Sequence, residues 1–241
     1  MNLIDKLIHD FNTCFIVKDR YKYITDGLLK TIKISFVALI LGIIIGTILA
    51  VIRTAYDCSY EEMKDGFKKK LLAIGNGIAK LYITVIRGTP VMIQMMIMFF
   101  VIFSFARDGL PVAMLTFGIN SGAYVAEIIR GGIMSVDYGQ TEASRSLGFN
   151  HIQTMTYVVI PQALKNVLPS LCNEFIALIK ETSVACYVAV NDLTKGGEII
   201  RSVTYIQALP LIVVALCYLI MVVILSKLVS LLERRLRETG K

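Results

Sequence analysis

The sequence predicts an all-α integral membrane protein with about five transmembrane helices, a broken second helix and a short helix in a cytoplasmic loop. Its 241 residues have a mean hydropathy of +0.68 and only 18% are charged, which is too apolar for a water-soluble domain of this size. The apolar runs are each long enough to cross a bilayer at about twenty residues per crossing. No long polar block is available for an ATPase or a soluble ligand-binding domain, so we expect such parts on other chains.

The predicted spans follow one another at residues 28–52, 71–105, 111–133, 173–190 and 209–232. The second run is too long for one straight crossing. It contains Arg87-Gly88-Thr89-Pro90, where proline disfavours a helical conformation in the preceding residue and glycine adds a second weak point. We therefore expect this helix to break there.

Two further features concern the shape of the helices. Gly42 and Gly46 in the first span form a small-xxx-small pattern that permits close helix approach. Chance explains the pattern equally well, because glycine is common in membrane helices.

Residues 157–171, between the loop and the fourth span, are mixed in polarity and contain Pro161 and Pro169. We expect a kinked helix there, at the cytoplasmic interface.

The polar stretch 137–153 interrupts the apolar chain and predicts two short helices joined by a turn. Its helix-start signals are two capping boxes, Asp137 with Gln140 and Asn150 with Gln153. Gly148 between them suits the left-handed conformation that ends a helix. Ala143 and Leu147 lie four residues apart on one side of the first helix, so a small apolar knob can face a partner protein. Taken alone, these signals also fit an ordinary polar connection between two spans.

The net charge of +7 comes largely from basic clusters beside apolar runs, such as Lys68-Lys69-Lys70. Such clusters suit anionic lipid headgroups and cytoplasmic loops, whereas a nucleic-acid partner would need a broader basic surface. The five cysteines have no Cys-x-x-Cys spacing and predict neither a disulfide framework nor a zinc site. His9 and His151 lack ligand spacing, so we expect no metal site.

The loop resembles the cytoplasmic "EAA" loop of permease subunits of bacterial ABC importers. Glu142, Ala143, Gly148 and Pro161 match that pattern, whereas Ser144 replaces its second alanine and Ile160 its leucine. The resemblance implies that the loop couples this chain to a separate ATPase. The coupling residues would be Gln140, Glu142, Ala143, Ser144, Leu147 and Gly148.

The segment from Arg87 to Pro90, followed by Gln94, resembles permeases for polar amino acids of the histidine, glutamine and arginine type. A broken helix at membrane depth is tolerated where its backbone lines a cavity, and such helices build midplane substrate sites. The Arg87 guanidinium suits a carboxylate, while Gly88 opens the backbone and Thr89 and Gln94 offer neutral hydrogen bonds. Alternatively, Arg87 extends to lipid headgroups or pairs with an acid in a span.

Two acids on the fourth span complete the predicted substrate site. The stretch from Asn173-Glu174 to Lys180-Glu181-Thr182-Ser183 resembles the same permeases, with Glu181 where aspartate is usual. Spacing of seven residues returns Glu181 to nearly the same helix face as Glu174. These acids would take the α-ammonium group and any cationic side chain of an amino acid. The alternative, which fits the sequence equally well, is that Lys180 or Arg87 neutralises the two acids in a salt-bridge ladder.

On the third span, Glu127 and Arg130 lie three residues apart and predict a local ion pair.

The resemblance implies one transmembrane permease domain over residues 1–241 that spans the inner (cytoplasmic) membrane of a bacterial cell several times, with 1–24 extracytoplasmic and 137–153 in the cytoplasm. Its partners would be a second permease subunit, either identical or a paralogue, two ATPase subunits carrying ATP and Mg, and an extracytoplasmic binding protein. No cofactor is expected on this chain. The segment 56–67, which includes Glu61 and Glu62, is longer than is usual in this family.

Other classes of protein fit the sequence less well. An ATP-independent channel or ion-coupled transporter would use Arg87 and the two acids but would need no coupling loop. A membrane enzyme would need a nucleophile and base or a metal constellation, and none is visible in the sequence.

The orientation of the chain follows from its basic residues. Lys227, Arg234 and Arg235 place the C-terminus in the cytoplasm, and an odd number of spans then places the N-terminus outside. Lys18 and Arg20 before the first span argue against this orientation, and the family resemblance decides for it.

Overall fold

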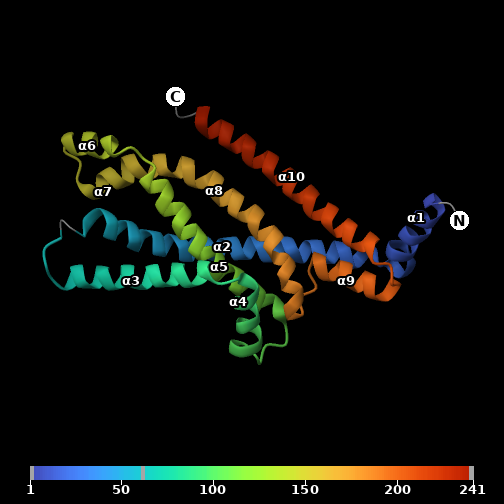
Figure 1. Ribbon diagram of the computed structural model, residues 1–241. Coiled ribbons are helices and arrows are strands. Elements are labelled where there is room, and N and C mark those ends of the chain that lie inside the picture. The colour runs from blue at the N-terminus through green and yellow to red at the C-terminus, as the bar shows by residue number, and fades with distance from the viewer. Residues whose placement is uncertain (1–2, 61–62, 239–241) are drawn as a thin grey trace. The chain divides into compact units, whose positions relative to one another are not determined.

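The computed structural model describes residues 3–60 and 63–238, which excludes Glu61 and Glu62 of the segment 56–67. The regular structure within these ranges is helical, which confirms the predicted fold class. In chain order (Figure 1) the α-helices are α1 (Leu3–Phe11), α2 (Tyr21–Ser59), α3 (Phe67–Gly88), α4 (Val91–Ile97), α5 (Gly109–Met134), α6 (Tyr138–Ser146), α7 (His151–Thr154), α8 (Ile160–Glu181), α9 (Leu193–Thr204) and α10 (Ala208–Glu238).

Among the described residues, 4 helices are long and apolar enough to cross a membrane. They are Tyr21–Cys58, Phe67–Gly88, Gly109–Met134 and Ala208–Leu236. The predicted span at 173–190 is the end of α8 followed by the 3-10 helix η5 (Thr182–Val188) and is not among these four. Residues 157–171, where a kinked helix was expected, are helical: they form the end of the π-helix η4 (Met155–Val159) and the first half of α8, which continues through Pro169 to Glu181. The kink stays a prediction.

The predicted break in the second apolar run is confirmed. Helix α3 ends at Gly88, Thr89 is extended with φ −121° and ψ 144°, and α4 begins at Val91. Proline at position 90 explains the extended conformation, because its ring disfavours a helical residue before it. The crossing therefore ends where the polar Arg-Gly-Thr-Pro segment lies.

The chain forms two compact units. The first contains Met1–Ala38, Val91–Phe117 and Phe175–Lys227. Its core joins the π-helical turn η1 (Asn12–Ile16), the start of α2, α9 and α10. The buried members of this core are Cys14, Phe15, Ile24, Leu193, Ile200 and Val214.

The second unit contains Leu39–Pro90, Gly118–Glu174 and Leu228–Lys241. Within it, the second half of α2 and α3 lie side by side, and Leu49 packs on a cluster that includes Ile83 (Figure 1). A Cβ atom added to Gly42 would lie 2.7 Å from the Oγ of Ser121, and one on Gly46 would lie 2.6 Å from Val125. The small-xxx-small pattern is therefore a packing feature that brings α2 close to α5.

Candidate functional site

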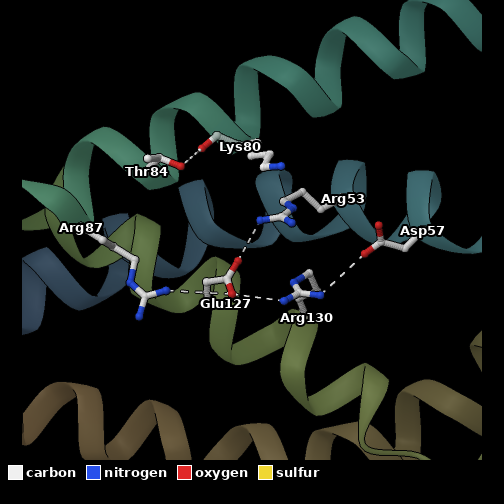
Figure 2. A network of polar contacts seen from close by, with 7 residues as sticks. All are labelled: Arg53, Asp57, Lys80, Thr84, Arg87, Glu127 and Arg130. Atoms are coloured by element: carbon white, nitrogen blue, oxygen red, sulfur yellow. Dashed lines mark hydrogen bonds and ion pairs between the residues drawn. The ribbon is translucent and has the colours of Figure 1, made fainter.

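Glu127 of α5 is the centre of an ion-pair network in the second unit (Figure 2). Its Oε1 atom accepts a hydrogen bond of 2.9 Å from Nη1 of Arg53, which extends from α2. Its Oε2 atom lies 3.3 Å from Nη2 of Arg130 and 4.0 Å from Nη1 of Arg87. The predicted local pair of Glu127 and Arg130 is confirmed, but it is one part of a larger arrangement that joins α2, α3 and α5.

A second acid, Asp57, ends the network on the α2 side, with its Oδ2 atom 3.7 Å from Nη1 of Arg130. Neither Arg53 nor Asp57 was predicted as a site residue. Their spacing of four residues on one helix face, at the end of the first apolar run, was the available signal. Three guanidinium groups and two carboxylates leave this network formally positive.

Arg87 is the most accessible member of the network. Its side chain is 44% exposed, whereas that of Arg53 is 17% exposed and that of Glu127 is 25% exposed. The guanidinium carbon of Arg87 lies 5.1 Å from the centre of the Tyr124 ring, within the range of a cation–π contact. Arg87 is thus oriented by an aromatic ring and by a carboxylate at long range.

The other residues predicted near the helix break are divided between the two units. Gly88 and Thr89 belong to the second unit, and Gln94 belongs to the first, where it is half-buried on α4. The Thr89 hydroxyl donates a 2.9 Å hydrogen bond to the Val85 carbonyl. A Cβ atom added to Gly88 would meet nothing within 4 Å, so the backbone at the break faces open space.

The two predicted acids also belong to different units, Glu174 to the second and Glu181 to the first, and both are half-buried. The Oε1 atom of Glu174 accepts a 2.8 Å hydrogen bond from the hydroxyl of Ser121 on α5, and Ser121 is fully buried. Ser121 was not predicted as a site residue, because a serine in a membrane helix is not unusual by itself. The proposed roles of both acids stay predictions.

The polar loop of residues 137–153 is a helix, a turn and a second helix, as predicted. Gly148 in the turn has φ +91°, the region that favours glycine. Asn150 and Gln153 form a complete capping box at the start of α7, with both hydrogen bonds at 2.9 Å. The box predicted for Asp137 and Gln140 is wrong. Asp137 caps α6 by accepting from the amide of Gly139, whereas Gln140 accepts a 3.3 Å hydrogen bond from Gln162 of α8.

Ser144 holds the two loop helices together. It is buried, and its hydroxyl donates hydrogen bonds to the Thr141 carbonyl at 2.9 Å and to the Thr154 hydroxyl at 3.0 Å. The alanine usual at this position in the resembling loops has no hydroxyl to make these bonds. Glu142, Ala143 and Leu147 are exposed, with Leu147 at 81%. Helix α6 therefore presents one acid and an apolar knob to its surroundings.

A cavity of about 340 Å³ lies behind the loop within the second unit. It is lined by Asp57, Cys58, Ile133, Met134, Val136, Tyr138, Thr141, Arg145, His151, Thr154, Met155 and Val159. Asp57 therefore takes part in the ion-pair network and also faces the space beside the loop helices. Among the described residues, no three or more metal-binding side chains gather in one place.

Residues 70–238 match the model of a family described as the binding-protein-dependent transport system inner membrane component. The chain belongs to this family. The permease is 36% identical over 217 residues to the glutamine transport system permease protein GlnP of Escherichia coli, covering 88% of this chain and 92% of that protein. It is 34% identical over 218 residues to the arginine transport system permease protein ArtQ of Bacillus subtilis, covering 89% and 93%.

A solved structure, described as an amino acid ABC transporter with histidines, is 39% identical to the permease. It superposes with a TM-score of 0.80 and covers 92% of this chain and 98% of that one. Permeases of this family are membrane-spanning transport subunits of ATP-driven importers and are not themselves catalytic. They work with a partner permease, an ATPase that uses ATP and a substrate-binding protein.

Proposed function

We propose that this permease imports a polar amino acid and that Arg87 binds the carboxylate of its substrate. The supporting observation is the position of Arg87 in the network, half-exposed and 4.0 Å from the nearest oxygen of Glu127. Arg53 lies nearer to that acid and is more buried. The network carries excess positive charge, so a substrate carboxylate near Arg87 gains attraction without displacing the short Arg53 pair.

The helix break offers room and polar backbone next to Arg87. The open space at Gly88 suits a ligand that approaches the main chain closely. Thr89, whose hydroxyl donates to the Val85 carbonyl, and Gln94 carry neutral polar side chains. These neutral groups suit the polar side chain of an amino acid such as glutamine, which GlnP carries by its name.

We assign Glu174 and Glu181 to the α-ammonium group and to any cationic side chain. Ser121 fixes the carboxylate of Glu174 by a 2.8 Å hydrogen bond, which orients the acid. Half-burial strengthens a charge-assisted contact because less water competes for the carboxylate. Arginine, which ArtQ carries by its name, would use such acids for its side chain.

The loop of α6 and α7 is proposed as the surface that receives the ATPase. Its exposed Glu142, Ala143 and Leu147 would make the contact, and the Ser144 hydrogen bond to Thr154 would make the two helices move together. Gln140 would pass the movement to α8 through Gln162. The C-terminus would then be cytoplasmic and the N-terminus outside, with two ATPase subunits bound to two permease subunits.

The test of the substrate site compares Arg87→Ala with Arg87→Lys in proteoliposomes that contain the complete complex. We expect Arg87→Ala to lose on the order of ten- to a hundred-fold in apparent affinity for glutamine or arginine, because a charge-assisted contact of roughly 1.5–3 kcal/mol is missing. Arg87→Lys should rescue poorly, since an ammonium group cannot form two parallel hydrogen bonds. Assembly with the ATPase, measured by co-purification, should be unchanged. Full uptake by Arg87→Ala would remove Arg87 from the substrate site.

A second experiment tests coupling. Glu142→Lys combined with Gly148→Trp reverses the charge on α6 and forbids the turn, so ATPase binding and ATP-driven uptake should both fall. Uptake that persists without ATP would instead indicate an ATP-independent channel or an ion-coupled transporter.

A further inference from the structure

The N-terminal helix α1 precedes the matched family segment 70–238 and takes no part in the proposed transport site. Its apolar residues Ile4, Leu7, Ile8 and Phe11 follow the i, i+3, i+4, i+7 spacing that gathers side chains on one helix face. The positions between them carry polar side chains, namely Asp5, Lys6, His9 and Asp10. Helix α1 is therefore amphipathic.

The apolar face of α1 is exposed. The relative exposure is 69% for Ile4, 52% for Leu7, 57% for Ile8 and 48% for Phe11. At its end the helix is held to the first unit, because the Phe11 ring lies 5.2 Å from the ring of the buried Phe15. The end of α1 thus contacts the buried Phe15, while four large apolar side chains remain exposed.

Exposed apolar residues also follow α1 along the chain, up to and into the first membrane span. Only residues 12–20 separate α1 from α2 (Figure 1), and Ile16 and Val17 among them are exposed. Tyr21 and Tyr23 at the start of α2 are exposed too, and tyrosine is enriched where a span meets the bilayer–water interface. Beyond them, exposed apolar residues such as Phe36 follow on the span itself.

We propose that α1 lies in the lipid–water interface, with its apolar face against the acyl chains and its charged face toward water. Lipid is the partner because the exposed apolar face of α1 lies only a few residues before a membrane span whose first turn carries exposed tyrosines. The charged face carries two aspartates and one lysine, so apolar contact, rather than attraction to anionic lipid, holds the helix in place. This assignment does not depend on the proposed role of Arg87 or of the coupling loop.

The absence of tryptophan from all 241 residues allows a direct test with single reporters. Ile8→Trp and Phe11→Trp place the indole on the apolar face, and Lys6→Trp places it on the polar face of the same helix. Leu219→Trp, at an exposed position within the span of α10, is the positive control for lipid contact. The full chain is reconstituted in nanodiscs of phosphatidylcholine with either ordinary or brominated acyl chains, and tryptophan emission is recorded.

We expect Ile8→Trp and Phe11→Trp to show blue-shifted emission and to lose most of their intensity in brominated lipid, as Leu219→Trp does. Lys6→Trp should keep most of its intensity. Equal, weak quenching at positions 6, 8 and 11 would overturn the proposal, because it would leave the whole helix in water. A blue shift at position 8 that appears only after the ATPase or the binding protein is added would also overturn it, because the face would then be a protein-docking surface.

Discussion

Replacing Glu127 by glutamine keeps the shape of the side chain but removes the charge shared by Arg53, Arg130 and Arg87. The contacts of 2.9 and 3.3 Å link α5 to α2 and to the next turn of α5 itself, and the side chains involved are 17–29% exposed. Removing one partner of a fully buried ion pair costs about 3–5 kcal/mol. Exposed pairs contribute about 0–1 kcal/mol. For this intermediate burial we expect Glu127→Gln to lower the free energy of unfolding by roughly 2 kcal/mol.

The matched control is Glu198→Gln on α9. Glu198 also lies near two cations, Arg201 at 3.4 Å and Lys195 at 3.9 Å, but these contacts are local to one helix and its side chain is 40% exposed. We expect a loss of at most about 1 kcal/mol for the control. Denaturant titration of the purified permease in detergent micelles measures both values. Equal effects of the two substitutions would refute the reasoning that the Glu127 network stabilises the packing of α2 on α5.

Three further predictions follow from single positions. Gly46→Ala should destabilise the permease by roughly 1–3 kcal/mol, because the new methyl group would lie 2.6 Å from Val125. The control is Gly77→Ala, whose methyl group would meet nothing within 4 Å and which should not destabilise the permease. The same denaturant titration measures both variants. Gly148→Ala should lower the free energy of unfolding by about 1–2 kcal/mol because alanine disfavours the positive φ at this position, and it should also lower ATP-driven uptake. Unchanged uptake would show that the turn tolerates other conformations. Burial raises the pKa of Asp192, which caps α9 beyond the predicted fourth span, from 3.8 to about 6, although the amide of Lys195 opposes the shift. The folded state therefore favours the protonated acid, so its contribution to stability is full below pH 3.8 and is lost as the pH rises through about 6. Asp192→Asn keeps a capping side chain but cannot titrate, so its melting temperature, measured over a series of pH values, should decline less across this range.

Local signals in the sequence were sufficient for three local features of the helices. The break at Gly88, the turn at Gly148 and the capping box at Asn150 each depend on residues within one helical turn, and the structure has all three. The membrane class also follows from sequence alone, because a bilayer requires long apolar segments with internally satisfied backbone.

Tertiary structure decided which partner each polar side chain has. Arg53 and Glu127 are 74 residues apart, and their pairing depends on how α2 and α5 rotate and approach through Gly42 and Gly46. Likewise Gln140 was predicted to cap its own helix, but its side chain bonds to Gln162 of α8 because packing offers that partner. Propensity and spacing indicate where several helices of this permease begin and end, whereas side-chain contacts between helices depend on distances that no local pattern records.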